Sequence, residues 1–171
     1  MYQYIPNLYF YTATCLEWKP LLDEDYHKKI ILDSLKFFVE NKVCLVYGFV
    51  IMPNHIHLIL KIDPEKRSNF QQRFLKFTAQ AIIDRMRVFY PKRLNSIVST
   101  QKDRKYHFWE RNSMWKQILT EKIFYQKLRY IHQNPTRGRH KIAQSSVDYE
   151  FSSALSYTMD EPKYSWLTLA K

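Results

Sequence analysis

The segment from Gly48 to Leu60, with the sequence GFVIMPNHIHLIL, constrains the fold of this chain more than any other stretch. Within it, His55 and His57 stand two positions apart in a run that otherwise predicts a buried β-strand. Because side chains alternate between the two faces of a strand, both imidazoles must point to one face, while Ile56 and Leu58 point to the other. Paired imidazoles can chelate a divalent metal. For an isolated His-x-His, however, a surface histidine beside a chance neighbour is the more common explanation.

Charge and composition favour a single globular domain that binds a polyanion. The 171 residues, 46% of them hydrophobic, are enough for one domain spanning 1–171 with a substantial core. The net charge of +11 favours a polyanionic partner, and nucleic acid is the usual one. Aromatic residues make up 16% of the chain, and interleaved basic and aromatic side chains suit single-stranded nucleic acid. The alternative is a protein with a solvated basic face and an aromatic-rich core.

Cysteine usage and hydropathy predict a cytoplasmic protein. Cys15 and Cys44 both lie in apolar, strand-like runs, which suits reduced and packed thiols. The first residues lack the features of a signal peptide, and no apolar run approaches the roughly 20 residues that span a bilayer. We therefore expect no membrane association.

Hydrophobic periodicity predicts an α+β fold. The almost wholly apolar run 43–52 predicts a central strand, and Ser68 is a plausible N-cap for a long helix. That helix carries one apolar stripe at Phe70, Phe74, Phe77, Ala81, Ile82 and Met86. The expected elements are strand 8–15, helix 26–40, strands 43–52 and 55–62, helix 68–89, one or two short strands in 106–119, helix 120–134 and a short helix near 152–157. This order predicts a ferredoxin-like, split βαβ fold, with a central antiparallel sheet and an added C-terminal helix.

The added helix, expected over 120–134, carries the second half of a candidate site. Tyr130 and Asn134 are spaced i, i+4 and therefore lie one turn from each other, roughly 40° apart around the axis. A phenolate is a competent nucleophile toward phosphorus when a metal polarises the phosphate. Two imidazoles and one amide oxygen would leave positions open on Mg²⁺ or Mn²⁺ for phosphate oxygens. Taken alone, Tyr130 is more often a packing residue, since the chain has thirteen tyrosines.

Two motifs in this order resemble those of the HUH-type single-tyrosine transposases, and in particular the REP-associated tyrosine transposases. The first is MPNHIHL, residues 52–58, in which His55-Ile56-His57 fits the pattern histidine, bulky hydrophobe, histidine. The second is LRYIHQNP, residues 128–135. In addition, FWER at 108–111 resembles the family's segment before its final strand and helix. The resemblance covers about 8–157, which we expect to be the core of the domain.

The resemblance implies a reaction and roles for individual residues. Enzymes of this family bind single-stranded DNA, often beside a hairpin, and their tyrosine attacks the scissile phosphate. The products are a 5′-phosphotyrosine intermediate and a free 3′-OH, which permits later strand transfer. By position, Tyr130 would be the nucleophile, and His55, His57 and Asn134 would ligate Mg²⁺ or Mn²⁺. His132 lies on a different side of the helix and is not expected to be a ligand.

Several basic residues are candidates for DNA contacts: Arg73, Lys76, Arg111, Arg137, Arg139 and Lys141. The two on helix 68–89 fall among its solvated positions, where a merely solubilising role is equally open. The cluster that follows Pro135 could grip a phosphate backbone, although relatives often continue there with more apolar residues. Segment 112–116 also lacks the His/Asp-rich motif of many relatives. Both departures bear on the recognition of DNA ends more than on strand cleavage.

The leading hypothesis is therefore a metal-dependent enzyme that cleaves and transfers single-stranded DNA, as a monomer or a homodimer. The first alternative is a non-enzymatic protein that binds single-stranded nucleic acid on the same scaffold. The second is a structural protein in which the histidine pair binds Zn²⁺ and Tyr130 merely packs. Only the first hypothesis predicts that Tyr130→Phe abolishes cleavage and leaves DNA binding intact.

Overall fold

The structure is a computed structural model that describes residues 6–102, 105–138 and 141–170. Its elements follow the order that the hydrophobic pattern predicts. The strands are β1 (Leu8–Thr14), β2 (Cys44–Ile51), β3 (His55–Ile62) and β4 (Met114–Gln117). The helices are α1 (Asp25–Glu40), α2 (Arg67–Phe89), α3 (Glu121–Gln133) and α4 (Ala154–Met159). Over these residues, no helix is both long enough and apolar enough to cross a membrane.

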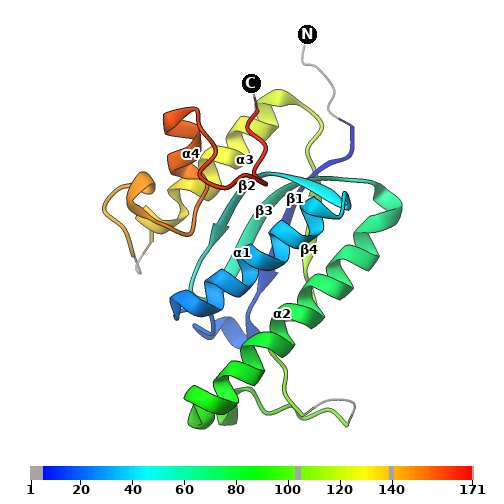
Figure 1. Cartoon of the computed structure of the whole chain (residues 1–171), viewed down its shortest axis with the longest axis vertical. Coiled ribbons are helices and arrows are strands. Elements are labelled where there is room, and N and C mark those ends of the chain that lie inside the picture. Colours follow the sequence, from blue (N-terminus) through cyan, green and yellow to red (C-terminus); the bar gives the residue numbers. More distant parts are fainter. Residues whose placement is uncertain (1–5, 103–104, 139–140, 171) are drawn as a thin grey trace.

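The four strands form one antiparallel sheet in the order β2-β3-β1-β4, which confirms the predicted α+β, ferredoxin-like fold. The two inner strands, β3 and β1, are those that the split βαβ topology places at the centre. Helices α1 and α2 lie side by side across one face of the sheet (Figure 1). The added helix α3 packs against β2 and β3 on the opposite face.

The prediction that the run 43–52 forms a central strand is wrong, because β2 lies at an edge of the sheet. The C-terminal part of the chain covers this edge. Leu167 forms a parallel bridge with Val46, and Ser152 forms an antiparallel bridge with Val50. Since β2 is thus buried without a second full strand beside it, its apolar sequence does not distinguish it from a central strand.

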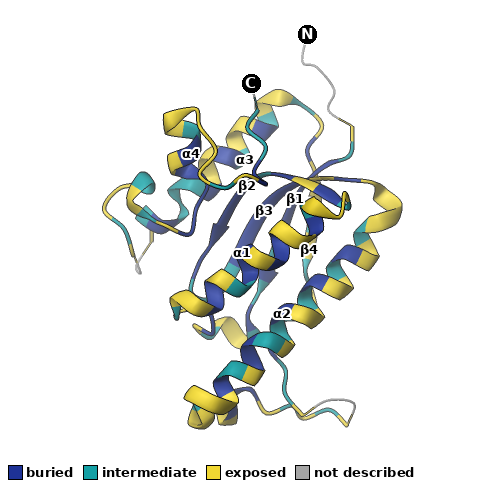
Figure 2. Cartoon of the chain, viewed as in Figure 1, coloured by how far each residue is buried: buried dark blue, intermediate teal, exposed yellow. Residues whose placement is uncertain are grey.

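Both faces of the sheet are buried over the central strands, as the dark blue strands in Figure 2 indicate. On β3, Ile56, Leu58 and Leu60 pack in the core beneath α1 and α2. Ile59 points the other way, into a smaller core that includes Leu128 of α3. The alternation predicted for the histidine strand is therefore present, and the histidine side of the sheet is the side that α3 covers.

Two expectations for α2 differ in detail from the structure. The helix begins at Arg67 rather than after Ser68, because a 3-10 turn at Pro64–Lys66 leads directly into it and Asp63 caps that turn. Phe77, expected in the buried stripe, is 59% exposed, and Thr78 is buried in its place. The Thr78 hydroxyl is satisfied there, since it donates to a backbone carbonyl of its own helix and accepts from an indole N–H.

The position of α3 depends on its own N-cap and on a glycine in the sheet. Thr120 caps the helix by accepting a hydrogen bond from the backbone N–H of Ile123, as the sequence pattern predicts. At the crossing with β2, a Cβ on Gly48 would lie 2.8 Å from Leu128 Cδ1 and 3.0 Å from Ile131 Cδ1. The absence of a side chain at Gly48 therefore lets α3 lie close to the sheet.

Candidate active site

The two histidines of β3 lie together beneath α3. Their ring centroids are 4.8 Å apart, on the single sheet face that strand alternation predicts. His57 is buried, and His55 is half-buried at the start of the strand. Trp18, in the 3-10 turn Leu16–Trp18 that follows β1, lies against His55 with 5.6 Å between ring centroids.

Both imidazoles are uncharged near neutral pH. Burial lowers the pKa of His55 to about 4 and that of His57 to about 3. A hydrogen bond with Asn134 opposes this shift in the pKa of His55, whereas repulsion from His55 and Lys127 adds to it for His57. Neutral imidazoles are the form in which histidine ligates metals.

Each imidazole is oriented by a hydrogen bond at its Nδ1 atom. His55 Nδ1 lies 2.7 Å from Asn54 Oδ1, and His57 Nδ1 lies 2.8 Å from Thr12 Oγ1. Because Asn54 Oδ1 can only accept, His55 Nδ1 must carry the proton, and the lone pair of its Nε2 remains for a ligand. The Thr12 hydroxyl permits the same tautomer in His57. This arrangement is typical of metal-ligating histidines, whose second nitrogen is held by an outer partner.

Tyr130 of α3 reaches the histidine pair. Its ring centroid lies 5.3 Å from that of His57 and 6.0 Å from that of Phe10 on β1. Phe10 in turn stacks on His57, with 5.1 Å between centroids and 27° between planes. Tyr130 nevertheless remains 45% exposed. The side chain is therefore placed by aromatic packing on one side and accessible to solvent on the other.

Asn134 lies directly after the last residue of α3, close enough to His55 for its side chain to raise the pKa of that imidazole. The three residues expected to hold a metal are thus neighbours, and together they offer two nitrogens and one amide oxygen. Among the described residues, no group of three or more His, Cys, Asp or Glu side chains could hold a metal ion. His132, which was not expected to ligate, points elsewhere, with its Nε2 2.8 Å from Ser153 Oγ. The donor set fits a divalent cation with further positions open to substrate oxygens.

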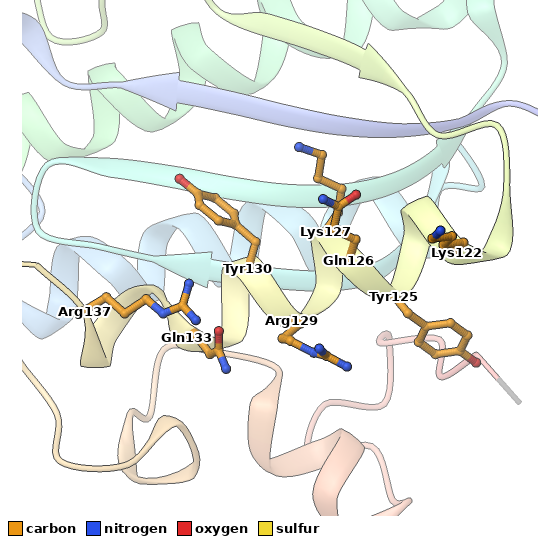
Figure 3. Close-up of a pocket in the computed structure, with 8 residues that line it drawn as sticks. All are labelled: Lys122, Tyr125, Gln126, Lys127, Arg129, Tyr130, Gln133 and Arg137. Carbon is orange, nitrogen blue, oxygen red and sulfur yellow. The ribbon is translucent and has the colours of Figure 1, made fainter.

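A basic pocket of about 670 Å³ adjoins Tyr130 along α3 (Figure 3). Its lining residues are Lys122, Tyr125, Gln126, Lys127, Arg129, Tyr130, Gln133 and Arg137. No carboxylate contributes to this lining, so its potential is positive and suits a phosphate chain. Lys127 rises from α3 toward the strands, where its Nζ lies 5.0 Å from the centroid of the Phe10 ring.

The candidate DNA-contacting residues are not all brought to this site. Arg137 lines the basic pocket, and Lys141 is exposed in the segment that follows α3. Arg111 is exposed near the end of β1, where its side chain bonds to Gln101. Arg73 and Lys76 lie on α2, in the layer on the opposite face of the sheet, so they cannot contact the same phosphate as Tyr130. Arg139 falls outside the described residues.

Three residues near the site were not singled out from the sequence. Lys127 lies three positions before Tyr130, and Arg129 lies one position before it. The i, i+3 spacing of Lys127 could have placed it on the same side of the helix as Tyr130. Trp18 carries no comparable signal, because it follows a different strand and only the fold brings it to His55.

Comparison with known proteins identifies the fold. The chain is similar to the REP-associated tyrosine transposase solved in complex with a REP hairpin, with a TM-score of 0.66 and 16% identity over 100% of this chain and 97% of that chain. A candidate transposase from Deinococcus radiodurans R1 has a TM-score of 0.48 and 17% identity over 74% of this chain and 88% of that chain. No family model and no curated protein sequence matches the chain. The first likeness confirms, at the level of the fold, the resemblance that the two motifs indicate.

Proposed function

We propose that this protein is a DNA strand transferase of the transposase type, which cuts single-stranded DNA with Tyr130 as its nucleophile. The observation that carries the proposal is the convergence of Tyr130 on the histidine pair, with 5.3 Å between its ring centroid and that of His57. His55, His57 and Asn134 would hold Mg²⁺ or Mn²⁺. When bound, this cation would polarise the phosphate and neutralise charge that develops on its oxygens.

The reaction exchanges one phosphate ester for another. The Tyr130 oxygen attacks phosphorus, the bond from phosphorus to the 3′ oxygen breaks, and the phenolic proton is lost to solvent while the leaving oxygen gains one. The products are a 5′-phosphotyrosine and a free 3′-OH. Because the new ester retains the energy of the old one, a 3′-OH from another strand can reverse the step without an external energy source.

The substrate class follows from charge and access. The pocket beside Tyr130 is lined by basic and neutral side chains, so it suits a phosphate backbone. Tyr130 is 45% exposed but held against the sheet, so a phosphate must be brought to it. The flexible backbone of a single strand can bend to do so more readily than that of a stiff duplex. The REP hairpin bound to the structural neighbour supports a substrate in which a hairpin flanks the single-stranded segment.

The test is a cleavage assay on single-stranded oligonucleotides that contain the hairpins flanking the chain's own gene, in Mg²⁺ or Mn²⁺. We expect a covalent protein–DNA adduct that survives denaturation, and its complete loss in Tyr130→Phe with DNA affinity unchanged. Tyr125→Phe is a matched control, since Tyr125 lies on the same helix, lines the same pocket and is 41% exposed. We also expect His57→Ala to abolish the metal-dependent reaction.

Two outcomes would contradict the proposal. Cleavage that persists in Tyr130→Phe would show that another group is the nucleophile. DNA binding with no adduct under any of these conditions would favour the alternative of a non-enzymatic single-strand-binding protein, for which the basic pocket alone would suffice.

A further inference from the structure

Trp18 is an exposed tryptophan at the edge of the histidine site. Its side chain is 60% exposed, although its ring lies against that of His55 with 5.6 Å between centroids and 64° between planes. Trp109 and Trp166 are buried, and Trp115 is half-buried and donates a hydrogen bond to a glutamine. An indole that is open to solvent beside a candidate active site offers a flat aromatic face on which a ligand can stack.

The backbone that carries Trp18 is held in an uncommon conformation. Glu17 and Trp18 both adopt left-handed geometry, with φ of 53° and 56°, which favours glycine rather than residues with a side chain. Such strained positions cluster at binding and catalytic sites and persist only where surrounding contacts enforce them. Here the backbone N–H of Leu16 donates to Phe108 O at 2.8 Å, and that of Glu17 donates to a Glu110 carboxylate oxygen at 2.6 Å.

One side chain couples this turn to the histidines. Asn54 donates from Nδ2 to the carbonyl oxygen of Trp18 at 3.3 Å, and its Oδ1 accepts from His55 Nδ1 at 2.7 Å. The same amide therefore holds the backbone that carries the indole and the imidazole of His55. Because its backbone is held in place, Trp18 loses little conformational freedom when a ligand stacks on its ring.

Charge indicates which part of a DNA strand would lie on Trp18. The turn brings together two carboxylates, those of Glu17 and Glu110, and one ammonium group, that of Lys19, which pairs with Glu17. The sum of these three charges is negative, which disfavours a phosphate at this end of the site. Lys127, on the other side of Tyr130, has an ammonium group that packs over the rings of Phe10 and Tyr130. The cationic end thus suits phosphates, and the indole end suits an uncharged base.

We propose that Trp18 is a stacking platform for one unpaired base next to the scissile phosphate. This inference rests on the proposed function, and it adds a residue that selects for single-stranded DNA, because a paired base would first have to break its pairing and stacking. The scissile phosphate would lie over the histidine pair and Tyr130, with the neighbouring base on the ring of Trp18.

The first experiment combines substitution with removal of single bases. Trp18→Ala should weaken the binding of a single-stranded oligonucleotide on the order of 10-fold, and Trp18→Phe should weaken it less, since a smaller ring still stacks. An oligonucleotide that lacks one base beside the cleavage site should bind the wild type and Trp18→Ala equally. Phe77→Ala is the matched control, because Phe77 is 59% exposed but lies on the opposite layer.

The second experiment uses the intrinsic fluorescence of the protein and does not depend on cleavage or on the stability of an alanine variant. Single-stranded DNA should quench the wild-type emission, and Trp18→Phe should lose most of this quenching because the remaining tryptophans are more deeply buried. Equal affinity of wild type and Trp18→Ala for every oligonucleotide, or quenching that persists in Trp18→Phe, would overturn the inference. If one of these two results were found in a protein that still cleaves DNA through Tyr130, only the role of Trp18 would be wrong. If the protein neither bound nor cleaved DNA, the proposed function would be wrong as well.

Discussion

His57 and Tyr130 face each other between β3 and α3, with 5.3 Å between their ring centroids and 63° between their planes. Phe10 of β1 packs against both rings, at 5.1 Å from His57 and 6.0 Å from Tyr130. Tyr130, the proposed nucleophile, is therefore held by rings on β1 and β3, which are rigid strands, rather than by residues of a loop. Such support keeps reacting groups close to a productive geometry.

The first prediction concerns the hydrogen bond that orients His57. Thr12→Val keeps the shape of the side chain and removes the hydroxyl that lies 2.8 Å from His57 Nδ1. We expect the affinity for Mn²⁺ to fall about 10- to 100-fold, because loss of an outer partner leaves a metal-ligating imidazole free to rotate. Calorimetric titration of the purified protein with Mn²⁺ would measure the change. Thr158→Val is the control, since that hydroxyl donates to Ala154 O within α4, and an equal loss in both variants would refute a specific role for Thr12.

The second prediction concerns the close approach of α3 to β2. Gly48→Ala places a methyl group 2.8 Å from Leu128 Cδ1, so the helix side chains must move. We expect the free energy of unfolding to fall by about 1 kcal/mol, because the contacted atoms are side-chain ends, and cleavage to fall further than DNA affinity. Urea denaturation and the cleavage assay would measure both. Leu128→Ala removes the side chain that the new methyl group would meet. The double variant should therefore lose less stability than the sum of the losses in the two single variants, and a loss equal to that sum would argue against the contact.

The third prediction concerns the charge of Lys127. Lys127→Met keeps the apolar stem over Phe10 and removes the ammonium group. We expect weaker binding to single-stranded DNA. The slope of log K against log[salt] should also become shallower by about 0.7, the change expected for the loss of one phosphate contact. Binding measured at several salt concentrations would test this. Lys29→Met on α1 removes the same charge from the opposite layer, and an equal change in its slope would show that only net charge matters.

The fourth prediction concerns pH and His27 of α1. Burial lowers the pKa of His27 from its ordinary value, and the hydrogen bond with Leu21 O opposes this shift, while Arg93 reinforces it and Asp23 and Glu24 weaken it. Because the unfolded chain takes up this proton near pH 6.5 and the folded chain only at lower pH, stability should fall as pH drops below about 6.5.

Urea denaturation at pH 7 and pH 5 would measure this effect. We expect a smaller difference between the two pH values in His27→Gln than in the wild type, although other buried histidines still contribute in the variant. His27 Nε2 has no hydrogen-bond partner among the described residues, so a proton added there would be buried without an acceptor. An unchanged difference in His27→Gln would contradict the assignment.

Most of the fold could be predicted from local patterns. The alternation in β3 predicted which side chains share a face, and Thr120 was found as an N-cap because capping is a contact within four residues. Two of the errors have one origin. The edge position of β2 and the exposure of Phe77 depend on which distant segment covers them, and hydropathy carries no information about the partner.

The candidate site divides in the same way. The His-x-His spacing and the i, i+4 spacing of Tyr130 and Asn134 are local, so they could be interpreted together with the resemblance. Lys127 was overlooked, although its position three residues before Tyr130 was available. Arg73 and Lys76 were wrongly grouped with the residues expected to contact DNA near Tyr130. The sequence of a basic helix face does not indicate which side of the sheet the helix covers.

By itself, the sequence determined the elements, the shared face of His55 and His57, and the turn of helix that carries Tyr130 with Asn134. Only the tertiary structure decided that this helix crosses the histidine face, and that Trp18 reaches His55 from the end of another strand. The physical reason is the range of the interactions. Periodicity and capping act over a few residues, whereas the packing of α3 over Gly48 and the hydrogen bonds of Asn54 join segments that meet only when the sheet forms.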